Sequence, residues 1–349
     1  MMVRSLNALA AAGALAAAMA LSAAPALAQQ VTLKLHTFIP PPSNPVKTFL
    51  KPWAEKIAKA SNGRLKIQIY PSMQLGGKPP QLMDQVRDGI VDIIFTLPGY
   101  TAGRFPKLEV FELPFVHTDP VSTTLALQDF QAKHLADEFK DYHVLLLHVH
   151  AGSMFMTKKK PIRKMSDLRG LKIRTATRAG GWYLASLGAV PIGAPRPQIP
   201  QMISKGVIEG AMLPFEIAPA IKMQELATHF TQLSGKQPRM NTSTFSLLMN
   251  KNSYNKLPAD LKKVIDDLSG RNIAQWAGQN WADIEVPAQK VMRSKSKNKF
   301  HMMPPSEVKK MKAMAKPAIE RWLKQMKRKG VDGAELLSDA RAMIAKYAK

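Results

Sequence analysis

The chain has 349 residues, 46% of them hydrophobic, and contains no cysteine. Its 50 Lys and Arg against 25 Asp and Glu give a formal net charge of +25, which favours anionic partners such as acidic solutes, membrane surfaces or nucleic acid. Without cysteine, disulfides, cysteine nucleophiles and zinc fingers are excluded, and no aromatic-basic motif of the RNA-binding type occurs. The fold must rest on its core, which is large enough for roughly two domains.

The first 28 residues have the features of a secretory signal peptide. Arg4 precedes an alanine- and leucine-rich run over 8–24, and Ala26-Leu27-Ala28 forms an A-x-A cleavage site. Because the run is short and alanine-dominated, we favour cleavage over a membrane anchor. No other stretch approaches the roughly 20 apolar residues that span a bilayer. We therefore predict an exported mature chain that begins at Gln29, which makes nucleic acid a poor partner.

Strands and helices alternate through the first half of the mature chain. Val31 to Leu35 is an alternating strand, and a helix over 46–60 leads to a strand over 64–70 with Leu65, Ile67 and Ile69 on one face. The pattern continues with a helix over 79–89, a strand over 91–95, a helix over 122–139, strands over 143–150 and 171–175, and a helix over 180–187. Such alternation predicts α/β layers with mostly parallel sheets.

The second half adds two strands and then becomes helical. The strands are expected over 206–212 and 244–250, and the helical stretches over 252–292 and 306–347. The whole pattern predicts one compact body of two α/β lobes with helical additions.

No catalytic signature is recognisable, because G-x-S-x-G, H-E-x-x-H and the P-loop are all absent from the sequence. His148 and His150 share one strand face and could hold a metal ion, but no carboxylate is in register, so we expect them to be packed or solvated. Glu109 and Glu112 lack a general-acid partner, and we expect solvated acids or hydrogen bonds at a hinge. We predict no enzyme, no cofactor and no metal site.

Arg174 is a candidate for ligand contact. It ends the run Asp167 to Arg174, at the carboxyl end of a predicted strand, and ligands of open α/β sheets bind outside those ends. A guanidinium there can clamp a carboxylate with two parallel hydrogen bonds. The alternative is an arginine that only makes a salt bridge.

Several motifs follow one another in a characteristic order. They are Gly63-Arg64-Leu65-Lys66-Ile67, Gln74-Leu75-Gly76-Gly77, Gly89-Ile90-Val91-Asp92, Phe111 to Phe115, Asp167 to Arg174, Gly188-Ala189-Val190-Pro191, Ser204 to Gly210, Lys222 to Leu226, and Leu257 to Leu261. The ordered set spans nearly all of the mature chain. It resembles the solute receptors of tripartite ATP-independent periplasmic (TRAP) transporters, the DctP-type family.

The resemblance implies a type II periplasmic-binding-protein-like α/β fold. Two lobes, joined by crossing strands and a long helix, would enclose a ligand cleft. We place lobe I at 29–150 plus about 240–280, and lobe II at 151–239 plus about 281–349. The protein would be a monomeric periplasmic receptor that delivers a small organic carboxylate to membrane permease subunits. Arg174 falls on the arginine that pairs with the substrate carboxylate in this family.

Departures from the family pattern bear on the ligand. Where many members have a second arginine, an Asn-Pro pair or a polar strand end, this chain has Ser153, Leu213-Pro214-Phe215 and Phe95 to Tyr100. Since a buried carboxylate requires a charged partner, we expect one carboxylate at Arg174 and an apolar or aromatic ligand body. The predicted substrate-binding residues are Arg174, Phe38, Leu97, Tyr100, Ser153, Thr177, Arg196, Leu213 and Phe215.

Three alternatives stay open. Arg196 lies in a loop that approaches the ligand in this family, so it could serve a dicarboxylate, ketoacid or sugar acid, or it could simply face solvent. A secreted polyanion-binding protein would bind long polyanions in a strongly salt-dependent way. A periplasmic enzyme would need a nucleophile or a metal constellation.

Overall fold

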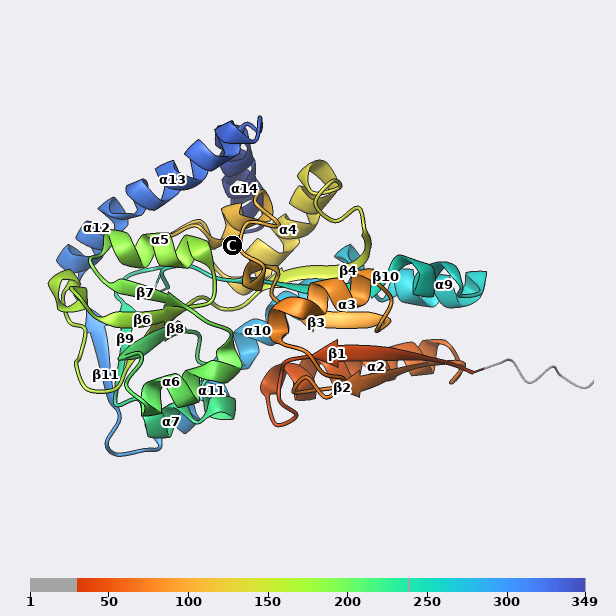
Figure 1. The fold of residues 1–349 in the computed structure, drawn as a ribbon, viewed down its shortest axis with the longest axis horizontal. Coiled ribbons are helices and arrows are strands. Elements are labelled where there is room, and N and C mark those ends of the chain that lie inside the picture. Colours follow the sequence, from red (N-terminus) through yellow and green to blue (C-terminus); the bar gives the residue numbers. More distant parts are fainter. Residues whose placement is uncertain (1–29, 238, 349) are drawn as a thin grey trace, which may run out of the picture.

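The computed structural model describes residues 30–237 and 239–348, so the predicted signal peptide lies outside the described part of the chain. Among the helices described there, none is both long enough and apolar enough to cross a membrane. The strands form two sheets on opposite sides of the molecule, with helix α10 between them (Figure 1). The prediction of an α/β protein with two lobes is confirmed.

Helices cover both sheets and join them. The α-helices are α2 (Lys51–Ala60), α3 (Leu82–Arg87), α4 (Pro120–His134), α5 (Arg178–Ser186), α6 (Ile199–Ser204), α7 (Met223–Leu226), α8 (Lys251–Asn255), α9 (Ala259–Asp267), α10 (Arg271–Asp283), α11 (Glu285–Arg293), α12 (Pro305–Ala313), α13 (Ala315–Arg328) and α14 (Gly333–Tyr347). Two short 3-10 turns near the site are η3 (Pro98–Tyr100) and η4 (Leu108–Glu112).

The first sheet has five strands. Their order is β2 (Leu65–Tyr70), β1 (Val31–Thr37), β3 (Ile93–Thr96), β10 (Thr244–Asn250) and β4 (Tyr142–Val149). β1 is parallel to β2 and β3, whereas β10 is antiparallel to β3 and β4. Leu35, Ile57 and Leu65 are fully buried in the core that this sheet shares with α2.

The second sheet has six strands. Their order is β11 (Lys299–Met303), β9 (His229–Leu233), β5 (Met154–Thr157), β8 (Gly210–Leu213), β6 (Lys172–Thr175) and β7 (Val190–Gly193). β5 is antiparallel to β8 and β9, and the other pairs are parallel. Both sheets are therefore mixed, which corrects the expectation of mostly parallel sheets. The sequence also gave no clear signal for β7, where Pro191 lies within an edge strand.

The chain passes between the sheets twice in segments that join one strand to the next. Residues 150–153 lead from β4 to β5, and residues 234–243 lead from β9 back to β10. The strands that directly follow the two passages, β5 and β10, are the ones that run antiparallel to their neighbours.

The two passages are in direct contact. The backbone N–H of Ser153 donates to the carbonyl oxygen of Asn241 (2.7 Å). Gly152 has a φ of +93°, and a Cβ there would lie 2.5 Å from Cβ of Arg239. Only glycine accommodates both the positive φ and this close approach, so the crossing is narrow.

A long helix makes the third connection. α10 and α11 are separated only by Ile284, which keeps helical torsion angles (φ −72°, ψ −13°). α10 packs against α4 and β4 on the first-sheet side, and α11 packs against α7 on the second-sheet side. The predicted connection by crossing strands and a long helix is confirmed.

The C-terminal helices also reach both sides. α13 packs against α5, and α14 packs against α4, along the upper edge of the view in Figure 1. The Nε1 of the fully buried Trp322 on α13 donates to the carbonyl oxygen of Pro106 (2.9 Å). The assignment of 281–349 to the second lobe stays a prediction. The lobe to which α14 belongs is the open point, because α14 packs against α4.

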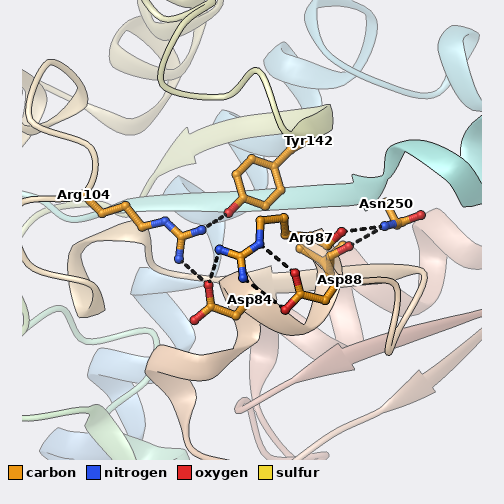
Figure 2. Close-up of polar contacts among 7 residues, drawn as sticks. Asp84, Arg87, Asp88, Arg104, Tyr142 and Asn250 are labelled. Carbon is orange, nitrogen blue, oxygen red and sulfur yellow. Dashed lines mark hydrogen bonds and ion pairs between the residues drawn. The ribbon is translucent and has the colours of Figure 1, made fainter.

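The loop after β3 is held in place by a polar network (Figure 2). Arg104 donates from Nη1 to Asp84 Oδ1 (2.7 Å) and from Nη2 to the hydroxyl of Tyr142 (2.5 Å). The side-chain N–H₂ of Asn250, at the end of β10, donates to two carbonyl oxygens in the last turn of α3 (2.8 and 3.0 Å). The network therefore fixes the loop over 97–107, which carries two predicted site residues, relative to the strands.

Candidate functional site

A cavity lies between the two sheets. Its walls come from the segments after β1 and β3, from both crossing passages, and from β6, β8 and the loops that follow them. The lining residues are Phe38, Leu97, Tyr100, His150, Ser153, Arg174, Thr175, Ala176, Arg196, Met212, Leu213, Pro214, Glu216, Ile217, Asn241, Ser243 and Phe245. All predicted site residues except Thr177 and Phe215 are among them.

Arg174 lies in β6 and is 2% exposed. Its Nε donates to the carbonyl oxygen of Ala194 (2.8 Å), while its Nη2 has no hydrogen-bond partner among the described residues. Burial lowers the pKa of this guanidinium, and the neighbouring Tyr100 hydroxyl acts in the opposite direction. Because arginine stays protonated in proteins and a buried charge requires a partner, this group is suited to hold an anion in the cavity.

Arg196 provides a second buried guanidinium. It is 4% exposed, so the solvent-facing interpretation is wrong. Its Cζ lies 4.9 Å from the centroid of the Phe38 ring, a cation–π distance, and its backbone N–H donates to the Tyr100 hydroxyl (3.0 Å). Burial lowers its pKa to about 10, which leaves it charged at neutral pH. Within residues 30–237 and 239–348, its Nε and Nη2 find no partner.

The remaining walls are mainly apolar and aromatic. Phe38 and Tyr100 meet edge to face, with ring centroids 5.3 Å apart. Leu97, Met212 and Leu213 are each at most 5% exposed and line the same space. The cavity thus combines two guanidinium groups with a surface that suits a ring.

Thr177 is not among the residues that line this cavity, and its role in ligand binding stays a prediction. It lines an adjoining outer hollow, which shares Tyr100, Thr175 and Ala176 with the cavity. Its Oγ1 accepts a hydrogen bond from the backbone N–H of Gly180 (3.2 Å) and caps the N-terminus of α5. The hydroxyl is therefore engaged in starting the helix.

Phe215 is not among the lining residues either, and its predicted contact with the ligand also stays a prediction. Its ring centroid is 6.1 Å from that of Phe300 and 5.2 Å from Cζ of Arg239. β8 ends at Leu213, so the alternation of side chains along that strand does not extend to Phe215.

Sequence reasoning missed two buried polar residues in the cavity, Glu216 and Asn241, each 3% exposed. Oε2 of Glu216 and Oδ1 of Asn241 have no hydrogen-bond partner in the described part of the chain. The departure from the family pattern at Leu213-Pro214-Phe215 directly precedes Glu216, and this departure could have indicated that Glu216 lies in the cavity. Asn241 lies on the second crossing passage, where the sequence carried no such signal.

A cluster of metal-ligating side chains occurs elsewhere, in His134, Glu335 and Asp339 of α4 and α14. None of the three lines the cavity. Lys133 Nζ already lies 2.6 Å from Asp339 Oδ2, so an ammonium group occupies the position that a cation would take. The cluster is explained as packing between two helices.

Comparison with known proteins adds a family and several relatives. The family model of bacterial extracellular solute-binding proteins, family 7, matches residues 36–325. The chain is 30% identical over 321 residues to the outer membrane transporter protein TsaT of Comamonas testosteroni, which covers 91% of this chain and 93% of that protein.

Two solved structures are similar over nearly their whole length. A TRAP solute-binding protein from Rhodoferax ferrireducens T118, in complex with copurified benzoate, is 44% identical with a TM-score of 0.89, covering 91% of this chain and 98% of that one. A marine metagenome TRAP solute-binding protein specific for aromatic acid ligands, in complex with 3-hydroxybenzoate, is 44% identical with a TM-score of 0.90, covering 92% and 100%.

Proposed function

Since the chain belongs to family 7 of the bacterial extracellular solute-binding proteins, we propose that it is the receptor of a TRAP-type transporter and captures an aromatic monocarboxylate. The observation that carries this proposal is the cavity between the lobes. Arg174 and Arg196 offer it three guanidinium nitrogens that are buried without a partner among the described residues. A carboxylate supplies acceptors for such donors, and charge-assisted hydrogen bonds of this kind are about twice as strong as neutral ones.

The remaining surface of the cavity supports an aromatic rather than a polyhydroxylated ligand body. A sugar acid would bring several hydroxyl groups against Phe38, Leu97 and Leu213, which offer no hydrogen bonds. A benzoate-like acid would instead bury its ring against them. The ligands of the two 44% identical relatives, benzoate and 3-hydroxybenzoate, agree with this chemistry.

The proposal extends to the cellular setting. The receptor acts in the periplasm after cleavage of the predicted signal peptide, and it passes its ligand to membrane permease subunits. It binds as a monomer, without a cofactor and without catalysing a reaction. A solute-binding family and a cavity suited to reversible anion binding support this role.

A thermal-shift screen of the mature chain tests the proposal, with benzoates, branched ketoacids, dicarboxylates, uronates and sialic acid. A ligand at about 100 times its dissociation constant should stabilise the fold by roughly 2.7 kcal/mol, a shift of a few degrees at this size. Benzoates should give the largest shift. Arg174→Ala should weaken benzoate binding by about 10- to 100-fold, because it removes a charge-assisted pair.

Arg169→Ala is the matched control. Arg169 is exposed and lies shortly before β6, and its substitution removes the same charge from the protein as Arg174→Ala. It should leave the benzoate shift unchanged. A larger shift with succinate or a uronate, or an undiminished benzoate shift in Arg174→Ala, would contradict the proposed function.

A further inference from the structure

Glu216 brings a carboxyl group into a cavity that otherwise attracts anions. It follows β8 in the Pro214-Phe215-Glu216 segment and is 3% exposed. A buried carboxylate in contact with the ligand would repel an anionic ligand, so its protonation and its hydrogen bonds decide what it does there.

Two neighbouring residues, Glu285 on α11 and Arg239 on the second crossing passage, determine the protonation of Glu216 and its hydrogen bonds. The backbone N–H of Glu216 donates to Oε1 of Glu285 (2.9 Å), the first residue of α11. Arg239 Nη2 donates to Oε2 of the same Glu285 (2.7 Å). The side-chain carboxyl of Glu216 hydrogen-bonds Glu285 as well. Arg239 lies closer to Glu285 than to Glu216, with which it forms no ion pair among the described residues.

Two carboxyl groups can share a hydrogen bond only when one of them carries a proton. Burial, and next the neighbouring Glu285, raise the pKa of Glu216 well above its ordinary range. Glu285, and not Glu216, forms the ion pair with Arg239 (Nη2 to Oε2, 2.7 Å). The proton therefore belongs to Glu216 and points to Glu285.

This arrangement fixes the hydrogen-bonding character of the other oxygen. A protonated carboxyl has a single O–H donor, and here Glu285 accepts it. The other carboxyl oxygen of Glu216, a residue that lines the cavity, is then an uncharged acceptor. Arg196 lines the same cavity, yet no hydrogen bond or ion pair joins it to Glu216 in that part of the chain.

We propose that the carboxyl oxygen of Glu216 that is not engaged with Glu285 accepts a hydrogen bond from a hydroxyl or amino group on the ring of the bound acid, so that the receptor prefers hydroxy- or amino-substituted aromatic carboxylates to unsubstituted ones. The inference rests on the proposed function and adds a specificity-determining residue to it. The Arg239–Glu285 ion pair holds Glu216 in place. Arg239 binds Oε2 of Glu285, and Oε1 of the same carboxylate accepts the backbone N–H of Glu216.

Calorimetric titration of the mature protein tests this inference with benzoate, the three hydroxybenzoates, the three aminobenzoates and the corresponding methoxybenzoates. At least one hydroxy or amino isomer should bind about tenfold more tightly than benzoate, the effect of one buried hydrogen bond. Its methoxy counterpart cannot donate and should lose this advantage. The ligand comparison needs no variant and therefore no assumption about folding.

Two variants then assign the effect to Glu216. In Glu216→Met the acceptor is removed, so the ratio of the affinity for the hydroxy or amino acid to that for benzoate should fall to about one. In Glu216→Gln the amide N–H₂ can donate to Glu285 in place of the proton and leave its oxygen free, so the preference should be kept within about threefold.

The outcomes separate the two proposals. If benzoate itself does not bind the unmodified protein, the proposed function fails. If benzoate binds through Arg174 but no donor-substituted acid binds more tightly, only the inference about Glu216 fails. It also fails if Glu216→Met keeps the preference or if Glu216→Gln loses it.

Discussion

His148 lies among aromatic rings in the core of the first lobe. Its ring stacks on those of Phe95 and Phe245, with centroids 5.5 and 5.1 Å away, and the Trp281 ring is 4.1 Å away. Burial lowers its pKa to about 3. The side chain therefore packs as a neutral ring, as the sequence interpretation favoured, and its environment offers hydrocarbon rather than carboxylates.

This burial has a consequence for acid stability. In the unfolded chain His148 has an ordinary pKa of 6.5, whereas in the fold it remains neutral down to about pH 3. As pH falls below 6.5 the unfolded state binds a proton that the folded state does not, so stability is lost at up to about 1.4 kcal/mol per pH unit until the folded pKa is reached. Above pH 6.5 this residue contributes no pH dependence.

His148→Phe should remove that part of the acid sensitivity. Phenylalanine keeps an aromatic ring in the cluster and cannot be protonated, so the variant should gain stability relative to the parent as pH falls from 6.5 to 5. Urea unfolding at pH 7.5, 6.5, 5.5 and 5 measures the difference. The value at pH 7.5 serves as the internal control, because a pure packing effect shifts every pH equally; a difference that does not change with pH would contradict the argument.

At the level of elements, the junction between β6 and α5 joins the strand of Arg174, the proposed ligand anchor, to the segment η4 on the other side of the cavity. Arg178, the first residue of α5, follows Arg174 by four positions. It donates from Nε and Nη2 to the two carboxylate oxygens of Glu109 in η4 (2.5 and 2.7 Å). η4 contacts β10 and α14, so this two-pronged ion pair spans the two sides of the cavity.

Disrupting this pair should weaken ligand binding without touching the cavity. The Glu109 side chain is 7% exposed and that of Arg178 24%, so breaking the pair should cost roughly 1–3 kcal/mol, less than for a fully buried pair. We expect Glu109→Gln and Arg178→Gln each to weaken benzoate binding by about tenfold and the double variant to add little, as a double-mutant cycle by calorimetry would show.

Asp267→Asn provides the matched control for this ion pair. Asp267 pairs with Lys263 on α9 across an exposed helix face, with both side chains more than half exposed. Such a pair contributes little, so its loss should leave benzoate affinity within a factor of about two. Full additivity of the Glu109 and Arg178 effects would show that the two residues act independently and would contradict the argument.

At the scale of the whole molecule, the net charge of +25 should speed the capture of anions. Charges outside the cavity attract an approaching carboxylate over distances that salt screens, whereas the contacts that we propose between the ligand and the buried Arg174 and Arg196 are shielded from salt. The association rate of benzoate should therefore fall on the order of tenfold between low and high ionic strength, with little change in the dissociation rate. Stopped-flow fluorescence separates the two rates.

A triple variant on α13 tests whether the basic face of this helix contributes to the salt dependence of the association rate. Lys324, Lys327 and Arg328 of α13 are exposed and do not line the cavity. Their replacement by glutamine should reduce the salt dependence of the association rate and leave the dissociation rate unchanged. Salt dependence that resides in the dissociation rate would contradict long-range attraction.

The sequence alone determined the class of the protein because its signals are local. Alternation of strands and helices, the ordered motifs and the arginine in a short strand are each read within a few residues, and the fold and the TRAP resemblance they predicted are confirmed. Residues at or just after the carboxyl end of a strand could be predicted to line the cavity, as Arg174 and Leu97 do.

Only the tertiary structure decided which distant side chains meet. Glu216, Arg239 and Glu285 come from a strand end, a crossing passage and a long helix, and no spacing along the chain relates them. Thr177 and Phe215 are not among the residues that line the cavity, because Thr177 caps the first turn of α5 and Phe215 lies beyond the end of β8. The physical reason is that periodicity reports which face of its own element a residue occupies, whereas burial and hydrogen bonding depend on the elements that the chain later brings against it.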